Sequence, residues 1–201
     1  EIMNLQGNNS YVKQKYVNNA ALLNKTLIQL YSKNTELGRW LRTKNVIEKI
    51  GDLLIVHGGI SNKINELNIG IIEINQIARN FYDDYRKDYN DLKINAIMGD
   101  KTAPFWYRGY YSGRSKDGLI DSTLQKFSVD YIITGHTIVS DTISVHHQGK
   151  VINVDTKHSE GETEALLVLG NNYYRVDIRG NVIPLLINRK RESNFAINPR
   201  K

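Results

Sequence analysis

The sequence predicts a mixed fold of the α+β class, in which helices come before strands. Apolar residues with helical spacing dominate the first half of the chain, whereas short apolar runs between turn residues dominate the second half. A length of 201 residues suits one folded unit with a core of its own. The composition is ordinary for a globular protein, with 40% hydrophobic and 24% charged residues, so disorder is not expected.

Four segments have the apolar spacing of helices. From Tyr11 to Ser32, apolar residues recur every three or four positions, which predicts one amphipathic helix. Short helices are expected at Glu36–Leu41 and Ile120–Phe127. The segment Ile64–Tyr89 predicts a long helix that is broken near Gly70.

Strands are predicted where short apolar runs lie between turn residues. Val46–Ile50 and Leu53–Val56 are joined by Gly51-Asp52, a pair that favours a tight hairpin turn. The segment Gly99–Asp117 is rich in glycine and aromatic residues. Its apolar residues have neither the spacing of a helix nor that of a strand, so we expect a long functional loop. The end of the chain is expected to form a β-meander, with strands at Tyr131–Thr134, Thr142–His146, Val151–Val154, Glu164–Leu169, Tyr173–Asp177 and Val182–Leu186.

Composition and charge exclude several kinds of protein. The chain has no cysteine, which excludes disulfides, a thiol nucleophile and iron–sulfur clusters. No apolar run approaches the roughly 20 residues of a membrane span, so we expect a soluble chain, cytoplasmic or exported. Of the net charge of +6, the segment from Arg189 to Lys201 carries +4. We therefore expect one domain over residues 1–188 and a flexible basic tail over 189–201, and nucleic acid is not an expected partner.

Two segments end an apolar strand with a histidine flanked by glycine. His57 follows Leu53–Val56, and His136 follows Tyr131–Thr134. A buried strand end fixes an imidazole, and neighbouring glycines leave room for a ligand. A single such histidine more often caps its strand and bonds to backbone, but two in the same setting favour a shared metal ion.

These motifs resemble signatures of the calcineurin-like metallophosphoesterases of the phosphoprotein-phosphatase type. His57-Gly58-Gly59-Ile60-Ser61 is similar to the fourth signature and Gly135-His136-Thr137 to the fifth. Glu1 is similar to the last residue of the third signature, Gly-Asn-His-Glu, whose histidine would lie outside the chain. Glu36–Arg42 and Pro104–Tyr110 resemble the bacterial-type Shewanella-like phosphatases in particular. The resemblance spans nearly the whole chain.

The resemblance implies a four-layer α/β/β/α sandwich, of which this chain supplies the C-terminal part. It implies a phosphomonoester hydrolase with two divalent ions, Mn²⁺ first and Fe, Zn or Mg as alternatives, in which His57 and His136 bind the second ion. The substrate would be a phosphorylated protein or a small phosphomonoester. The signatures that carry the remaining ligands are not in the sequence, so we expect these 201 residues alone to be inactive.

Arg108 is the candidate phosphate clamp, because a guanidinium presents two donors to two phosphate oxygens. The alternative is an arginine that stacks on Trp106 or Tyr107 for packing alone. Further candidates for lining the site are Gly58, Gly59, Tyr107, Gly135, Thr137 and His158.

A function of another class stays open, a non-catalytic module that binds a partner through the aromatic loop and the meander edge. The coding sequence before Glu1 discriminates between the two, because Gly-Asn-His at that place would support the enzyme.

Overall fold

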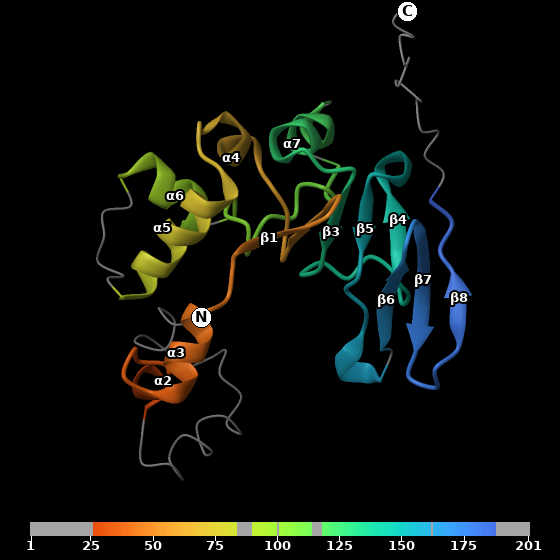
Figure 1. Ribbon diagram of the computed structural model, residues 1–201, viewed down its shortest axis with the longest axis horizontal. Coiled ribbons are helices and arrows are strands. Elements are labelled where there is room, and N and C mark those ends of the chain that lie inside the picture. Colours follow the sequence, from red (N-terminus) through yellow and green to blue (C-terminus); the bar gives the residue numbers. More distant parts are fainter. Residues whose placement is uncertain (1–25, 84–89, 100, 114–117, 162, 188–201) are drawn as a thin grey trace, which may run out of the picture. The chain divides into compact units, whose positions relative to one another are not determined.

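The computed structural model describes residues 26–83, 90–99, 101–113, 118–161 and 163–187 (Figure 1). The predicted tail at 189–201, the helix residues before position 26 and Glu1 lie outside these ranges. The chain divides into two compact units, Glu1–Asn45 with Arg79–Lys87, and Val46–Ala78 with Asp88–Lys201. In the described ranges, no helix is long and apolar enough to cross a lipid bilayer.

The first unit consists of short helices joined through one arginine. It contains α2 (Leu27–Leu30), α3 (Glu36–Arg42) and the end of α5 (Ile71–Asp83), shown in Figure 1. The Thr35 hydroxyl caps α3 by accepting a hydrogen bond from the Gly38 amide at 3.1 Å. The Arg42 guanidinium donates to the Tyr31 carbonyl and pairs with the Asp83 carboxylate at 2.8 Å. The predicted short helix at Glu36–Leu41 is therefore confirmed.

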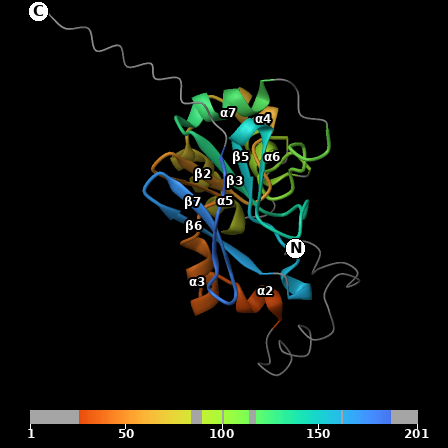
Figure 2. The same ribbon diagram turned by 90° about the vertical axis from the view of Figure 1, so that its right-hand side faces the viewer.

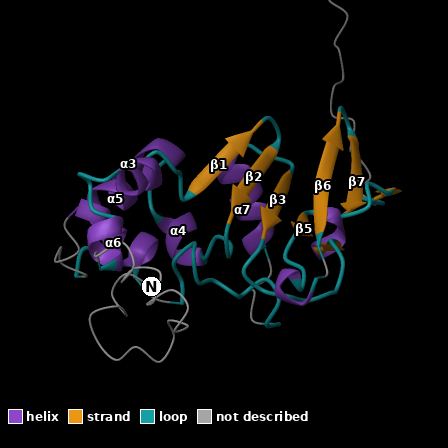
Figure 3. Cartoon of the chain, turned by 90° about the horizontal axis from the view of Figure 1, so that it is seen from below, coloured by secondary structure: helices purple, strands orange, loops and turns teal. Residues whose placement is uncertain are grey.

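The second unit is built on a five-stranded mixed sheet in the order β1-β2-β3-β5-β4. Strands β2, β3 and β5 are parallel, whereas β1 and β4 are antiparallel edge strands. Figure 3 shows β1, β2 and β3 side by side. The five strands are β1 (Ile47–Ile50), β2 (Leu53–Val56), β3 (Tyr131–Thr134), β4 (Ser144–His146) and β5 (Val151–Asn153).

The register of the parallel strands decides which residues meet at one edge of the sheet. Val56 is paired with Thr134, and Thr134 with Asn153. The chain segments that leave these three strands therefore start side by side at the carboxyl edge, where α/β sheets commonly bind ligands. His57 and His136 lie in two of these segments.

One face of this sheet is covered by four helices of the second unit. Their apolar side chains pack with those of the strands around Leu54 and Ile132, which are fully buried. The 62–83 region is two helices with a break before Ile71, as predicted near Gly70, because Leu67 adopts an extended backbone. A seven-residue helix that begins after the Asp91 cap was not predicted from the sequence. The helices are α4 (Asn62–Glu66), α5, α6 (Leu92–Met98) and α7 (Leu119–Phe127).

The other face of the sheet packs against a three-stranded antiparallel meander, blue in Figure 2. Ile133 and Ile152 form the centre of this contact, and the ring of Tyr131 lies 5.2 Å from that of Tyr173. The predicted meander holds for the last three strands, whereas the preceding ones join the first sheet. The meander consists of β6 (Glu164–Leu169), β7 (Asn172–Asp177) and β8 (Val182–Pro184), and the short 3₁₀ helices are η2 (His147–Gly149) and η3 (His158–Glu160). The described layers are thus helices, sheet and sheet.

Candidate metal centre

Two histidine rings meet at the carboxyl edge of the five-stranded sheet. His57 directly follows β2, and His136 follows β3 after one glycine. Nε2 of His57 lies 3.0 Å from Nδ1 of His136, and the ring centroids are 4.8 Å apart. The structure therefore brings together two nitrogens that are 79 residues apart in the sequence.

The spacing of the two nitrogens fits one metal ion. Two ligands at right angles on an octahedral ion, with bonds of about 2.1 Å, lie about 3.0 Å apart. The observed separation of 3.0 Å matches that edge, and in metal-free protein it also suits a hydrogen bond between the rings. Within the described ranges, no cluster of three or more histidine, cysteine or acidic residues could hold a metal. The described residues thus offer two nitrogens at a spacing that two ligands of one ion would have.

A tight turn carries the ring of His136. The Gly135 amide donates to the His57 carbonyl at 2.8 Å, and the Thr137 amide donates to the Gly135 carbonyl at 2.7 Å. Between them His136 has a φ of 65°, in the left-handed region, which is uncommon for a residue with a β-carbon. The ring position thus depends on an unusual local backbone.

The surroundings of His136 favour its neutral form. Burial lowers the pKa of the ring, the charges of Arg108 and His57 lower it further, and the Asp155 carboxylate opposes them. Neutral imidazole is the form that binds a metal. The indole of Trp106 lies nearly perpendicular to the ring, with centroids 5.6 Å apart. These residues surround the ring pair with one cation, one carboxylate and one aromatic wall.

The aromatic loop is fastened to the segment that follows His57. The Gly58 amide donates to the Pro104 carbonyl at 2.7 Å, and the Ile60 amide donates to the Tyr110 hydroxyl at 3.1 Å. The rings of Tyr107 and Tyr110 meet edge to face at 5.4 Å. This packing holds the loop that carries Trp106 beside the candidate centre.

Sequence comparison identifies the family of the chain. The sequence model of the calcineurin-like phosphoesterases matches residues 2–140. The chain belongs to the calcineurin-like phosphoesterase family. Members of this family use divalent metal ions, which agrees with a ring pair spaced for one ion. The comparison with curated protein sequences finds no match.

The solved structures that this chain resembles are described as phosphatases. The cold-active protein-tyrosine phosphatase of a psychrophilic Shewanella species is 34% identical, with a TM-score of 0.79, over 88% of this chain and 54% of that one. A second structure of a cold-active protein tyrosine phosphatase is 33% identical, with a TM-score of 0.79, over 90% of this chain and 54% of that one. The chain thus spans about half the length of these structures. The likeness confirms the predicted metallophosphoesterase fold and the Shewanella-like type.

The other predicted site residues of this calcineurin-like phosphoesterase differ in exposure and in their distance from the ring pair. Arg108 is exposed on the aromatic loop, close enough to His136 to affect its pKa. The Thr137 hydroxyl is buried and has no hydrogen-bond partner among the described residues. His158 is exposed in η3 and bonds to the Thr163 hydroxyl at 3.2 Å, and the described part of the chain does not join it to the ring pair in a metal-binding cluster. Glu1 lies outside the described residues.

Three residues beside the ring pair were not predicted as parts of the site. Asp155 and Asn153 are brought to it by the pairing of β5 with β3, and Trp106 by the folding of the loop. Only the position of Asp155, directly after the predicted strand Val151–Val154, gives a signal in the sequence.

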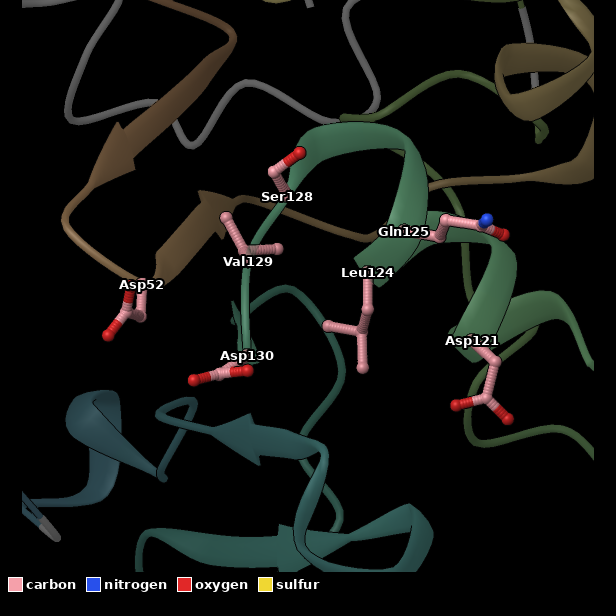
Figure 4. Close-up of a pocket in the computed structure, with 7 residues that line it drawn as sticks. All are labelled: Asp52, Asp121, Leu124, Gln125, Ser128, Val129 and Asp130. Carbon is pink, nitrogen blue, oxygen red and sulfur yellow. The ribbon is translucent and has the colours of Figure 1, made fainter. Parts of the chain in front are cut away.

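A separate hollow of about 390 Å³ lies at the opposite end of β2 and β3 (Figure 4). Its wall includes Asp52 from the β1–β2 turn, Asp130 before β3, and Asp121 on α7, which pairs with Lys150 at 2.6 Å. This hollow shares no residue with the candidate centre.

We expect Gly58→Ala to destabilise the fold and displace the aromatic loop. An added β-carbon would lie 2.8 Å from the carbonyl oxygens of Pro104 and Tyr107, which are backbone atoms and cannot rotate away. The expected loss in the free energy of unfolding is about 1–3 kcal/mol, measured by urea denaturation. The matched control is Gly70→Ala, where the new methyl group meets nothing within 4 Å. Equal stability of the two variants would contradict the close approach at Gly58.

Proposed function

We propose that the chain is the C-terminal part of a catalytic domain that hydrolyses phosphate monoesters with two divalent metal ions. The observation that carries the proposal is the 3.0 Å separation of two ring nitrogens at the ends of neighbouring parallel strands. The family and the phosphatases of similar structure support it.

Each described residue has a distinct part in the proposed chemistry. Nε2 of His57 and Nδ1 of His136 hold one ion, because these atoms face each other at the spacing of two ligands. When bound, such ions supply Lewis-acid polarisation of phosphoryl oxygens. Arg108 binds two phosphate oxygens through its planar guanidinium. Trp106 packs against the ring of His136 and limits its freedom to turn.

The rest of the coordination shell is proposed to come from the full-length gene product. Two imidazoles without carboxylates bind hard ions poorly, and the chain spans 54% of the Shewanella phosphatase. Residues before Glu1 would then supply the carboxylates, and Glu1 would end the Gly-Asn-His-Glu motif. Mn²⁺ is the proposed ion, with Fe, Zn or Mg as alternatives.

The proposed substrate is a phosphorylated protein, with a small phosphomonoester as the alternative. The similar solved structures are described as protein tyrosine phosphatases, which supports phosphotyrosine as one candidate beside phosphoserine and phosphothreonine. The exposed indole of Trp106, 39% accessible, would offer an aromatic leaving group a surface beside the ring pair.

The test compares the full-length gene product with residues 1–201 alone, using p-nitrophenyl phosphate and Mn²⁺. We expect hydrolysis that depends on metal from the full-length product and none above background from the chain. Phosphate release by the chain alone would overturn the predicted inactivity. If neither the full-length product nor the chain hydrolyses the substrate, the proposed enzymatic function is wrong and the partner-binding module is favoured.

A further inference from the structure

We propose that Asn153 is a positioning residue that fixes the ring of His136 for metal binding. This proposal rests on the proposed function, in which His57 and His136 are metal ligands. Asn153 would act through the turn that carries His136, since its side chain bonds to the Thr137 carbonyl and the Asp155 amide.

The ring of His136 is not oriented in the usual way. A metal-binding histidine commonly donates its second ring N–H to a carboxylate, a carbonyl or water, which fixes the ring. In the described part of the chain, Nε2 of His136 is buried and has no hydrogen-bond partner. Among these residues, the orientation of the ring depends on the contact of its Nδ1 with His57, on the Trp106 indole and on the backbone turn.

That turn is held at both of its ends. At its start, the Gly135 amide donates to the His57 carbonyl at 2.8 Å. At its end, the Asn153 side-chain amide donates to the Thr137 carbonyl at 2.9 Å. His136, with its left-handed backbone, lies between these two hydrogen bonds. Loss of the hydrogen bond from Asn153 would release the end of the turn at Thr137 and let the ring of His136 move away from His57.

Asn153 is placed for this task by the sheet. It is paired with Thr134 across the parallel β3–β5 ladder, it ends β5, and it is fully buried. Its side-chain oxygen accepts from the Asp155 amide at 2.8 Å, while its nitrogen reaches the Thr137 carbonyl. One side chain thus joins the segment after β3 to the segment after β5.

To join these two segments, the side chain needs both a hydrogen-bond donor and an acceptor. Asparagine has both, whereas the isosteric aspartate has only acceptors. Asn153→Asp keeps the shape and the acceptor for the Asp155 amide but removes the donor to the Thr137 carbonyl. A carboxylate oxygen would then face a carbonyl oxygen, an arrangement that repels.

The matched control is Asn75→Asp in the same unit. Asn75 is also buried, accepts from the Val46 amide at 2.8 Å and donates to the Ile47 carbonyl at 2.9 Å. The control therefore loses the same kind of bond, but at the start of β1 rather than at the turn.

The experiment uses the full-length gene product and three readouts: the Mn²⁺ dissociation constant by calorimetry, the ¹⁵N imidazole resonances of His136 in metal-free protein, and the urea midpoint of unfolding. We expect Asn153→Asp to raise the dissociation constant at least about tenfold and to shift the resonances of His136. Asn75→Asp is expected to lower the midpoint while leaving the dissociation constant within about twofold and the resonances unchanged. Asn153→Ser, which is neutral and smaller, replaces Asn153→Asp if that variant does not fold.

The outcomes separate this inference from the proposed function. Wild-type affinity and resonances in Asn153→Asp would overturn the inference, as would equal changes in Asn75→Asp. If the wild-type protein binds no Mn²⁺, the proposed function fails, and the resonances of His136 in the metal-free variants still decide for or against Asn153.

Discussion

His57→Asn in the full-length gene product is expected to lower kcat/KM roughly a thousandfold, which corresponds to about 4 kcal/mol of transition-state stabilisation. The change removes one of the two nitrogens that lie 3.0 Å apart, and the shorter side chain cannot restore it. The value of kcat/KM and the metal content per chain should fall together, and with the proposed two-metal site the content would fall from two ions to one. The urea midpoint should change little, because His57 is exposed.

The partner ring and a distant histidine serve as controls for this result. The double variant of His57 and His136 should be no worse than either single variant, since both act on one ion. His146→Asn removes an imidazole on the edge strand β4, whose ring bonds to the Ser144 hydroxyl, and should stay within about threefold of wild type. Full activity in His57→Asn would contradict the metal-binding role of the ring pair.

Arg108→Ala is expected to lower kcat/KM about a hundredfold, and Arg108→Lys about tenfold, with metal content unchanged. An ammonium group keeps the charge beside His136 but cannot present two parallel donors to a phosphate. The inhibition constant of inorganic phosphate should rise in the same order, and calorimetry should show unaltered Mn²⁺ affinity.

A matched control separates phosphate binding from packing by Arg108. Arg39→Lys changes an arginine on α3 that donates to the Asn34 carbonyl, and it should leave the phosphate constant unchanged. If Arg108 only packs against its aromatic neighbours, its variants will lose stability while the phosphate constant stays the same. Unchanged kinetics would remove Arg108 from the site.

The sequence predicted the elements whose signal is local. The runs that form β2 and β3 are short, apolar and followed by a histidine beside glycine, so both the strands and the two rings could be found. The hairpin turn was likewise predicted from a local signal, the Gly51-Asp52 pair. In the structure Gly51 has a φ of 55°, which glycine adopts readily.

Two of the missed features depend on contacts between segments that are distant in the sequence. The role of Asn153 follows from its register opposite Thr134, and no pattern near Asn153 indicates that partner. The contact of Trp106 with His136 likewise joins residues 30 positions apart along the chain. Helix α6 spans seven residues and lies between the predicted long helix and the predicted loop, where no helix was predicted.

The parallel pairing of β2 with β3 has a consequence for how the protein assembles. The two rings belong to segments 79 residues apart, so the loop between their strands has to close before the two nitrogens can meet. A divalent ion therefore has no preformed pair of nitrogens to bind in the unfolded chain. Because the pair of nitrogens exists only when the two strands are paired, a bound ion would stabilise the native state by mass action.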